Sequence, residues 1–491
     1  MRPPLRWIGW CLNLPGPAAA PPHGGPRRRG VLSDVIVPPI PRSRLRAGVG
    51  PRLRVTPQIE TLPWIAAWLI AVPSVSAASG APPRGAVEGT LRPLAAEDEQ
   101  LLDRIQRDAF RYFLDQANPA TGLVADASRP GAPASIAATG FGLAALCIGE
   151  SRGWISHDEA YARVFRTLST VRKRLAHERG FYYHFVDAAT GERVWSSEAS
   201  SIDTALLLAG ALTAAQHFEG TEIELLGNYL YRRTEWPWMM TNDGLLSMGW
   251  KPEQGFLHAT WDWYNEGILL YALALSSPTY PIPSEAWHRW RRAERVYAGT
   301  PVIYSYFGSL FTYQYAQAYI DFRHLYDGSV NYWQNSVNAA AANRQFCRDQ
   351  AAQHAGYRQG YWGLTAGDGP SGYRGYGAEP AEVALHDGTI NPYGMIAALP
   401  FDATAALDAL KALLNGHGER IYGEYGFRSG FNLDQDWWSR QYLGIDQGIS
   451  VLMIENVRSG RVWDTFMRNP YIRQWLGRCM AREPARKLPG S

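Results

Sequence analysis

The sequence lacks the patterns that mark several common kinds of functional site. Its 491 residues include four cysteines, Cys11, Cys147, Cys347 and Cys479, and no C-x-x-C pair, which excludes a zinc ribbon and a thioredoxin-like motif. One disulfide is possible among them, and its pairing stays open. The 11 histidines show neither H-x-x-x-H nor H-E-x-x-H spacing, so the sequence predicts no metal site and no cofactor.

An excess of charge of one sign is also missing. The 48 lysines and arginines nearly balance the 45 aspartates and glutamates, which leaves a formal net charge of +3. A nucleic-acid binder would normally carry a basic patch or stripe, so we expect no nucleic-acid partner. The hydrophobic content of 46% is enough to bury a large core.

An apolar run from Leu62 to Val75 is too short to span a bilayer. It ends in small residues, and the string SVSA, which closes at Ala77, loosely fits a signal-peptidase site. We therefore expect a secretory signal peptide over residues 55–78 and a mature protein that is periplasmic or secreted, without a membrane association. A short membrane anchor and a plain apolar linker are the alternatives.

The segment before the signal, residues 1–54, is rich in Pro, Arg and Gly and shows no periodicity. We expect it to be unstructured and expect translation to start internally, at Val49 or Val55. Residues 79–94 read as a linker. The sequence does not determine the oligomeric state.

What the sequence has in abundance is aromatic residues, with 19 Trp, 26 Tyr and 16 Phe. Trp and Tyr have a flat apolar face and a polar edge. Sugar rings are divided in the same way, with C–H groups on a face and hydroxyls at the rim. The composition is therefore typical of a carbohydrate binder, and it fits a large aromatic core equally well.

From residue 95 onward the apolar spacing is helical almost throughout. Apolar runs at 180–187, 300–307 and 423–432 predict short strands between the helices. The number and pairing of helices predict an all-α fold, an (α/α)6 toroid of six helical hairpins, as one catalytic domain over residues 95–485. The helical stretches are 95–117, 139–149, 157–176, 201–218, 222–233, 264–275, 284–297, 311–326, 334–352, 391–398, 402–413 and 441–456.

Two motif-like strings carry no function in this context. Gly149 to Gly153 matches G-x-S-x-G, but a nucleophile elbow follows a strand, whereas an Ala/Leu-rich helix precedes this string. It is typical of a helix end with a turn. The Gly-rich segment 367–377 lacks the G-K-[ST] ending of a phosphate loop and predicts a sharply turning loop.

Three separated segments place carboxylates beside aromatic residues where an apolar helix begins. Asp262 and Glu266 would share one helix face if their helix begins early. Asp203 fits the role of a helix cap equally well. The carboxylates of the three segments are Glu198 and Asp203, Asp262 and Glu266, and Asp434, Asp436 and Asp446.

This pattern is suited to glycosidic cleavage. A glutamate buried among Trp and Tyr loses hydration, which raises its pKa and keeps it protonated as a general acid. A second carboxylate that stays ionised can activate water. The alternative for each single residue is a cap or a buried salt bridge.

The chain also resembles a known family over roughly residues 95–480. The strings that carry the resemblance include DGTINPYGMIAALPF, WDWYNEGILLYALALSSPTYPI and YGFRSGFNLDQDWWSRQYLGIDQGISVLMIEN. They are similar to the bacterial glycoamylase-like family, which includes the endo-β-1,2-glucanases of glycoside hydrolase family 144. The resemblance implies an (α/α)6 barrel and hydrolysis of linear β-1,2-glucan to short sophoro-oligosaccharides with inversion.

Carried onto this sequence, the resemblance implies that Glu266 is the general acid. It leaves the general base open, with Glu198 first, then Asp446 and then Asp203. The carboxyls of an inverting pair lie roughly 6.5–9.5 Å apart, and a relay through a substrate hydroxyl or second water would widen that gap. Ser429 and Gly430 depart from the polar or acidic residue expected in relatives, which affects the expected subsite.

The expected sugar contacts come from the aromatic residues and from loop placement. Of the aromatic candidates named below, we expect about half to line a cleft and the rest to belong to the core. The predicted contacts are Trp195, Trp250, Trp261, Trp263, Tyr264, Trp362, Tyr373, Trp437, Trp438, Arg374, Gln447 and Asp262.

Two other functions are kept as alternatives. One is an exo-acting hydrolase that releases sophorose, or a β-1,2-glucan transglycosylase, on the same barrel. The other is a glucan-binding protein without catalysis. The acidic clusters argue against the latter, because sugar binding needs the aromatic residues but not desolvated acids.

Overall fold

The computed structural model describes residues 94–482. The predicted unstructured start, signal peptide and all but the last residue of the linker lie outside the described residues, as do the final residues of the predicted domain. Within the described part, each helix is too short or too polar to cross a membrane.

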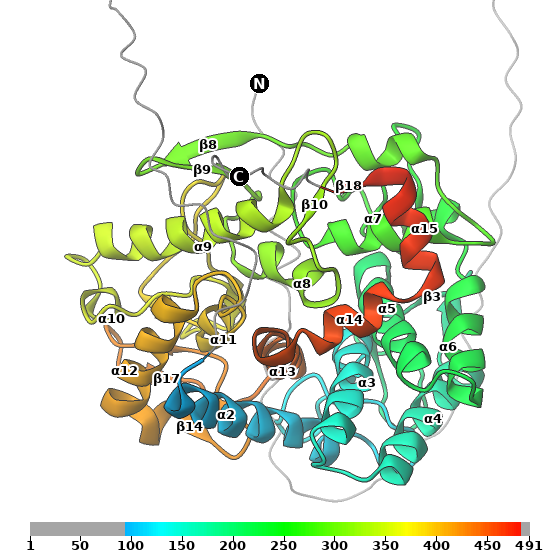
Figure 1. Cartoon of the computed structure of the whole chain (residues 1–491), viewed down its shortest axis with the longest axis horizontal. Coiled ribbons are helices and arrows are strands. Elements are labelled where there is room, and N and C mark those ends of the chain that lie inside the picture. Colours follow the sequence, from blue (N-terminus) through cyan, green and yellow to red (C-terminus); the bar gives the residue numbers. More distant parts are fainter. Residues whose placement is uncertain (1–93, 483–491) are drawn as a thin grey trace, which may run out of the picture. The chain divides into compact units, whose positions relative to one another are not determined.

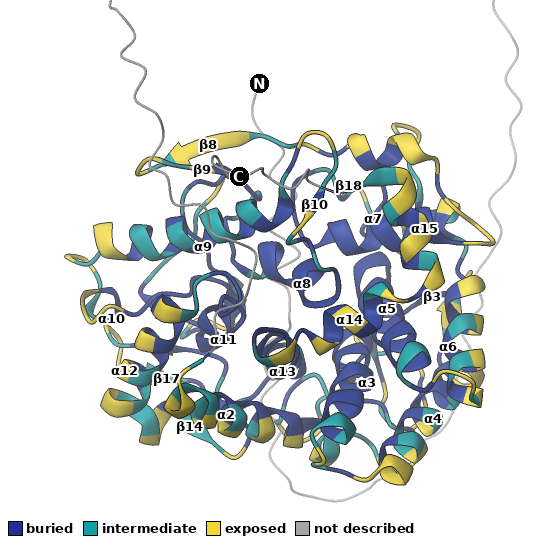
Figure 2. Cartoon of the chain, in the orientation of Figure 1, coloured by how far each residue is buried: buried dark blue, intermediate teal, exposed yellow. Residues whose placement is uncertain are grey.

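Six helices of the described part form an inner set that is buried on nearly all sides. Neighbours pack in sequence, α3 on α5, α5 on α7 and α7 on α8, while α13 contacts α8, α11 and α3 and so closes the ring. Figure 2 shows these helices buried along most of their length. The inner helices are α3 (Ile136–Ser151), α5 (Ser201–His217), α7 (Gly267–Ser276), α8 (Phe311–Tyr319), α11 (Pro392–Ile396) and α13 (Gly444–Ser459).

A second set of helices covers the first (Figure 1). Each outer helix buries one apolar stripe and exposes a charged one, as expected for a helix at a surface. Helix α2 packs on α13 and α3, α4 on α3, α6 on α5, α15 on α7, α9 on α8 and α12 on α11. Their bounds are α2 (Ala96–Asp115), α4 (His157–Lys173), α6 (Glu222–Arg232), α9 (Tyr332–Asp349), α12 (Ala403–Ile421) and α15 (Pro470–Cys479).

This alternation of inner and outer helices is the predicted all-α (α/α)6 architecture, and the prediction is confirmed. Four short helical segments add to it: the 3-10 helices η1 (Trp236–Met239) and η2 (Ser284–His288), and the helices α10 (Ala355–Arg358) and α14 (Arg461–Met467).

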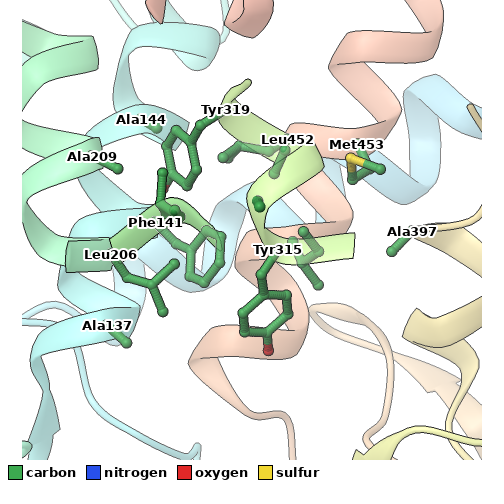
Figure 3. Packing of buried hydrophobic residues seen from close by; sticks show 14 of the residues in the cluster. Ala137, Phe141, Ala144, Leu206, Ala209, Tyr315, Tyr319, Ala397, Leu452 and Met453 are labelled. Atoms are coloured by element: carbon green, nitrogen blue, oxygen red, sulfur yellow. The ribbon is translucent and has the colours of Figure 1, made fainter. Parts of the chain in front are cut away.

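The core lies between the inner helices, as the close view in Figure 3 shows. Phe141 of α3 contacts two rings of α8: the centroids of Phe141 and Tyr315 are 5.5 Å apart in an edge-on arrangement, and those of Phe141 and Tyr319 are 6.0 Å apart and stacked. Aromatic pairs prefer these offset geometries. Such contacts join helices from distant parts of the chain into one apolar centre.

Helices α3 and α5 approach each other through glycine. A Cβ atom on Gly210 would lie 1.9 Å from the carbonyl oxygen of Gly140, far inside van der Waals contact. We therefore expect Gly210→Ala to lower the free energy of unfolding by about 3 kcal/mol, because the helices must move apart. Urea unfolding measures the change.

A matched control for Gly210 is Gly477 on outer helix α15, where an added Cβ would meet nothing within 4 Å. Gly477→Ala should leave stability unchanged or raise it by about 0.5–1 kcal/mol, because alanine favours helix. Equal effects of the two substitutions would contradict the close packing of α3 on α5.

The strands of the described part are two to four residues long and pair antiparallel within the loops. Several of them directly precede inner helices: β1 ends where α3 begins, and β5 where α5 begins. They therefore fix the loops at the N-terminal ends of the inner helices. The pairs and triplets are β1 (Ala134–Ser135) with β4 (Phe185–Val186); β2 (His177–Glu178) with β3 (Phe181–Tyr182); β5 (Ala199–Ser200), β6 (Gly249–Lys251) and β7 (Gly255–Phe256); β8 (Glu294–Tyr297) with β9 (Thr300–Ile303); β10 (Leu325–Tyr326) with β18 (Ala481–Arg482); β11 (Ala366–Gly367) with β12 (Arg374–Gly375); β13 (Thr389–Ile390), β16 (Phe431–Asn432) and β17 (Trp437–Trp438); and β14 (Tyr422–Gly423) with β15 (Gly426–Phe427).

The structure corrects some predicted elements. The helix predicted over 284–297 is only η2, followed by strand β8, because Ala298 and Gly299 adopt positive φ angles of 46° and 83° and make a tight hairpin turn. The helix predicted to reach residue 326 ends at Tyr319, and α14 and α15 were not predicted. The predicted ends of α3 near the G-x-S-x-G string and the turn in the Gly-rich segment agree with the structure.

The helix predicted over 264–275 begins at Gly267, with Glu266 at its N-cap. Asp262 therefore lies in the preceding loop, and the shared helix face of Asp262 and Glu266 does not exist. The Asp262 carboxylate instead lies 3.5 Å from the Arg291 guanidinium.

Candidate active site

The predicted catalytic carboxylates lie where inner helices begin. Asp203 is in the first turn of α5, with Glu198 in the segment just before it; Glu266 is the N-cap of α7, and Asp446 is in the first turn of α13. All four are buried. Positive helix dipole ends near the site favour anionic side chains there.

An imidazole joins two of these carboxylates. His184 Nδ1 lies 3.0 Å from Glu198 Oε1, and His184 Nε2 lies 3.4 Å from Asp203 Oδ1. Burial lowers the pKa of His184, but the Asp203 charge and the hydrogen bond to Glu198 outweigh it and raise that pKa to about 9. The imidazole is therefore a charged donor between the two acids.

The same contact sets the charge of Glu198. Burial alone would raise the pKa of Glu198, but the hydrogen bond from His184 and its charge hold the pKa below the ordinary value. Burial raises the pKa of Asp203, against the charge of His184 and the Ser200 hydroxyl, which donates to Asp203. Of this pair, Glu198 therefore has the lowered pKa and ionises more readily, whereas the pKa of Asp203 is raised.

Glu266 has the opposite character. Burial, with a smaller contribution from the charge of Asp203, raises its pKa to about 8. Its Oε2 atom has no hydrogen-bond partner among the described residues. A protonated carboxyl with an unused oxygen is suited to donate a proton to a bound ligand.

Asp446 belongs to a second acidic group. Burial raises the pKa of Asp446 well above its ordinary value, and the charges of Asp368 and Asp126 act in the same direction. Burial also raises the pKa of Asp126 to about 6, against the charges of His184 and Arg129. The mutual influence of these charges shows that the three carboxylates face one region.

Two tyrosines lie near Glu266 and Asp446. Burial raises the pKa of Tyr315 and Tyr393, and the charges of both Asp446 and Glu266 raise it further. The carboxylates from α7 and α13 therefore approach the same pair of rings. The fold thus brings the three predicted acidic segments together, and the residues they contribute to the site are Glu198, Asp203, Glu266 and Asp446.

Sequence reasoning missed three residues of this group. Asp126 precedes inner helix α3 just as Glu198 precedes α5, so the same rule, a carboxylate before a buried helix, could have found it. Asp368 lies in the Gly-rich loop, where Ser439 donates to it. No signal in the sequence placed His184, which lies in a predicted strand, beside acids of another segment.

Asp434 and Asp436 lie in salt bridges elsewhere. Asp434 contacts His354 at 2.7 Å, and Asp436 contacts Arg420 at 2.5 Å. Neither ion pair involves the acidic group around Glu266.

The predicted aromatic contacts divide into two sets. Tyr264 and Trp362 are almost fully buried and belong to the hydrophobic core, where Tyr264 packs on Tyr332. Trp261 is also buried and donates to the Ser201 hydroxyl, and Trp263 is buried under Arg291. The residues of the predicted set that retain exposure are Trp195, Trp250, Asp262, Tyr373, Arg374, Trp437 and Trp438.

Not every exposed member of that set is close to the acids. Trp438 stacks on Phe431 with centroids 5.3 Å apart, under the Arg420 guanidinium. Tyr373, in contrast, acts on the pKa of Tyr315 and is therefore near the acidic group. Gln447 is buried and donates to the Phe427 carbonyl, so its amide nitrogen is already used within the fold.

The described residues contain one group with metal-type ligands at metal-type spacing, formed by His184, Glu198 and Asp203. Both nitrogens of this imidazole face carboxylates, and its raised pKa keeps it protonated. The group therefore has the character of an ion-paired cluster.

Fold and site together define a class of protein: an (α/α)6 barrel with buried carboxylates of opposed protonation at the N-terminal ends of its inner helices. Residues 258–470 match the family model Glycoamylase, described as "Putative glucoamylase". A Bacteroides uniformis protein whose crystal structure carries the same description is 30% identical, with a TM-score of 0.74 over 80% of this chain and 99% of that one. The chain belongs to this glycoamylase-like family.

Two further relatives have more specific names. The exo beta-1,2-glucooligosaccharide sophorohydrolase (non-reducing end) of Parabacteroides distasonis is 30% identical over 431 residues, which are 79% of this chain and 59% of the relative. The endo-beta-1,2-glucanase of Chitinophaga pinensis, solved with sophorotriose and glucose, is 26% identical, with a TM-score of 0.72 over 79% of this chain and 98% of that one. Both names refer to chains of β-1,2-linked glucose.

Proposed function

We propose that the protein is a glycoside hydrolase that cleaves linear β-1,2-glucan to short sophoro-oligosaccharides with inversion and without a cofactor. The observation that carries the proposal is the opposed protonation of Glu266 and Glu198. Glu266 is buried and protonated, as a general acid requires, while His184 keeps Glu198 ionised, as a general base requires. The named activities of the relatives support β-1,2-glucan as the substrate.

The test is an incubation with β-1,2-, β-1,3-, β-1,4- and α-linked glucans, followed by chromatography of the products. We expect turnover of β-1,2-glucan alone. We also expect the optical rotation of the reaction mixture to change in the direction that inversion at the anomeric carbon produces. Cleavage of a different linkage would contradict the proposed substrate. Binding without cleavage would favour the non-catalytic alternative.

A second candidate is exo-acting release of sophorose, which the name of the Parabacteroides distasonis relative favours. The same chromatogram separates the two: a ladder of oligosaccharides indicates endo-cleavage, and a single disaccharide indicates exo-cleavage. A gain of longer chains would indicate transglycosylation.

Export is a further part of the proposal. It rests on the apolar run from Leu62 to Val75 and the small residues that follow it. Amino-terminal sequencing of the protein recovered from a bacterial periplasm or medium should find a start after Ala77. An intact amino terminus in the cytoplasm would contradict export.

A further inference from the structure

Arg129 connects three loops that precede neighbouring inner helices. It lies in the loop before α3, where it is 4.0 Å from Asp126. Its Nη1 donates to Gln441, in the loop before α13, at 3.1 Å, and its guanidinium lies over the ring of Trp195, in the loop before α5, at 5.9 Å. We refer to Arg129, Trp195 and Gln441 as the Arg129 wall.

The Trp195 ring is unusually exposed for its size, with 45% of its surface open to solvent. Trp195 and Ser196 also adopt positive φ angles of 56° and 49°, a region that non-glycine residues rarely occupy. Strained backbone that persists in a fold is found mainly at functional sites. Here it presents an aromatic face to solvent at the edge of the acidic group.

The wall is connected to the proposed catalytic residues through a chain of aromatic contacts. Trp195 packs on Phe185 with ring centroids 5.1 Å apart, and Phe185 stacks on His184 at 3.9 Å. His184 in turn holds Glu198. Two rings, Phe185 and His184, therefore connect the wall to Glu198, the proposed general base.

Charge balance indicates what kind of ligand fits. The Arg129 guanidinium faces the Asp126 carboxyl, so the wall offers donors and acceptors without a free positive charge for an anion. A flat indole face beside mixed donors and acceptors suits a neutral ring with C–H groups on one face and hydroxyls at the rim. Glucose has this chemistry.

We infer that the Arg129 wall is a sugar subsite that binds a glucose unit beyond the two at the cleaved bond. The ring stacks on Trp195, and its hydroxyls bond to Arg129 and Gln441. The inference rests on the proposed function for the identity of the chain. It adds that Arg129 and Trp195 govern substrate binding and chain length, and not the chemical step.

The experiment compares Trp195→Ala and Arg129→Ala with the wild type on β-1,2-glucan and on sophoro-oligosaccharides of increasing length. We expect KM for long chains to rise about tenfold while kcat changes little, because the contact is lost equally from ground and transition states. The gain in kcat/KM with each added glucose should shrink. Trp195→Phe should restore most of the binding, because it keeps an aromatic face.

A matched control is the pair Arg172 and Tyr229 on the outer helices α4 and α6. Arg172 lies 4.7 Å from the Tyr229 ring centroid, and Tyr229 is also 45% exposed. Tyr229→Ala should leave KM and the chain-length dependence as in the wild type. Thermal unfolding of every variant distinguishes lost binding from lost folding.

Wild-type KM and chain-length dependence in both wall variants would overturn the inference. A wild type that does not cleave β-1,2-glucan would contradict the proposed function instead. In that case calorimetric titration with sophoro-oligosaccharides still tests the wall: weaker binding in Trp195→Ala than in Tyr229→Ala supports it, and equal binding or none at all overturns it.

Discussion

Glu266→Gln is expected to lower kcat on β-1,2-glucan by about 10³-fold, within the range for loss of a general acid. The amide has the shape of the carboxyl but no acidic proton to donate to the leaving oxygen. Initial rates of reducing-end formation measure the loss. The melting temperature should stay close to that of the wild type, because Glu266 Oε2 has no hydrogen-bond partner to lose among the described residues.

The same assignment predicts the alkaline side of the pH profile. Because burial raises the pKa of Glu266 to about 8, its proton is present below that pH and lost above it. The value of kcat/KM for the wild type should therefore fall as the pH rises through about 8. Undiminished turnover by Glu266→Gln, or a wild-type rate that is flat through this range, would show that another group is the acid.

Glu198→Gln is expected to have the second large effect, a loss of about 10²–10⁴-fold in kcat, because the amide cannot accept the proton of the attacking water. Glu198 is favoured over Asp446 because His184 holds the pKa of Glu198 below its ordinary value, whereas burial raises the pKa of Asp446 well above its own. Azide added to Glu198→Gln should restore turnover by replacing the activated water, and it should yield a glycosyl azide with inverted configuration.

Asp446→Asn is the companion measurement. If Glu198 is the base, azide restores Glu198→Gln alone, and Asp446→Asn remains insensitive to it. Rescue of Asp446→Asn, with Glu198→Gln unaffected, would transfer the role of base to Asp446. The two substitutions are equally conservative, and each of the two carboxyls is buried, so the contrast does not depend on exposure.

Helical periodicity predicted the barrel because nearly every inner helix is an uninterrupted apolar run, such as the one after Glu266. The carboxylates at the helix starts were predicted as site residues for the same reason, since they lie directly beside such apolar runs. The two-residue strands were mostly missed, because their pairing depends on loops distant in sequence. The role of His184 could not be predicted, because it arises only when the loop before α5 folds back onto the segment around residue 184.

The aromatic residues show the other limit of the sequence. Trp195 and Trp362 were equally plausible sugar contacts, yet one is exposed and strained while the other is buried. Spacing cannot separate these cases, because both lie in loops and the difference is made by neighbours from other hairpins. The contact between Arg129 and Trp195 likewise forms only in the folded protein, where the loops that carry Arg129, Trp195 and Gln441 meet.

The packing of α2 against α13 determines when the protein can complete its fold. Gln106 in α2 donates to the Val451 carbonyl, 345 residues later in the chain. During synthesis the apolar faces of α3, α5 and α7 therefore emerge long before the last inner helix that covers them. Contacts of such separation form slowly and leave intermediates prone to aggregation. Synthesis of the stretch from Ser151, the end of α3, to Gly444, the start of α13, takes on the order of half a minute at bacterial rates, and α3 lacks this cover for that time.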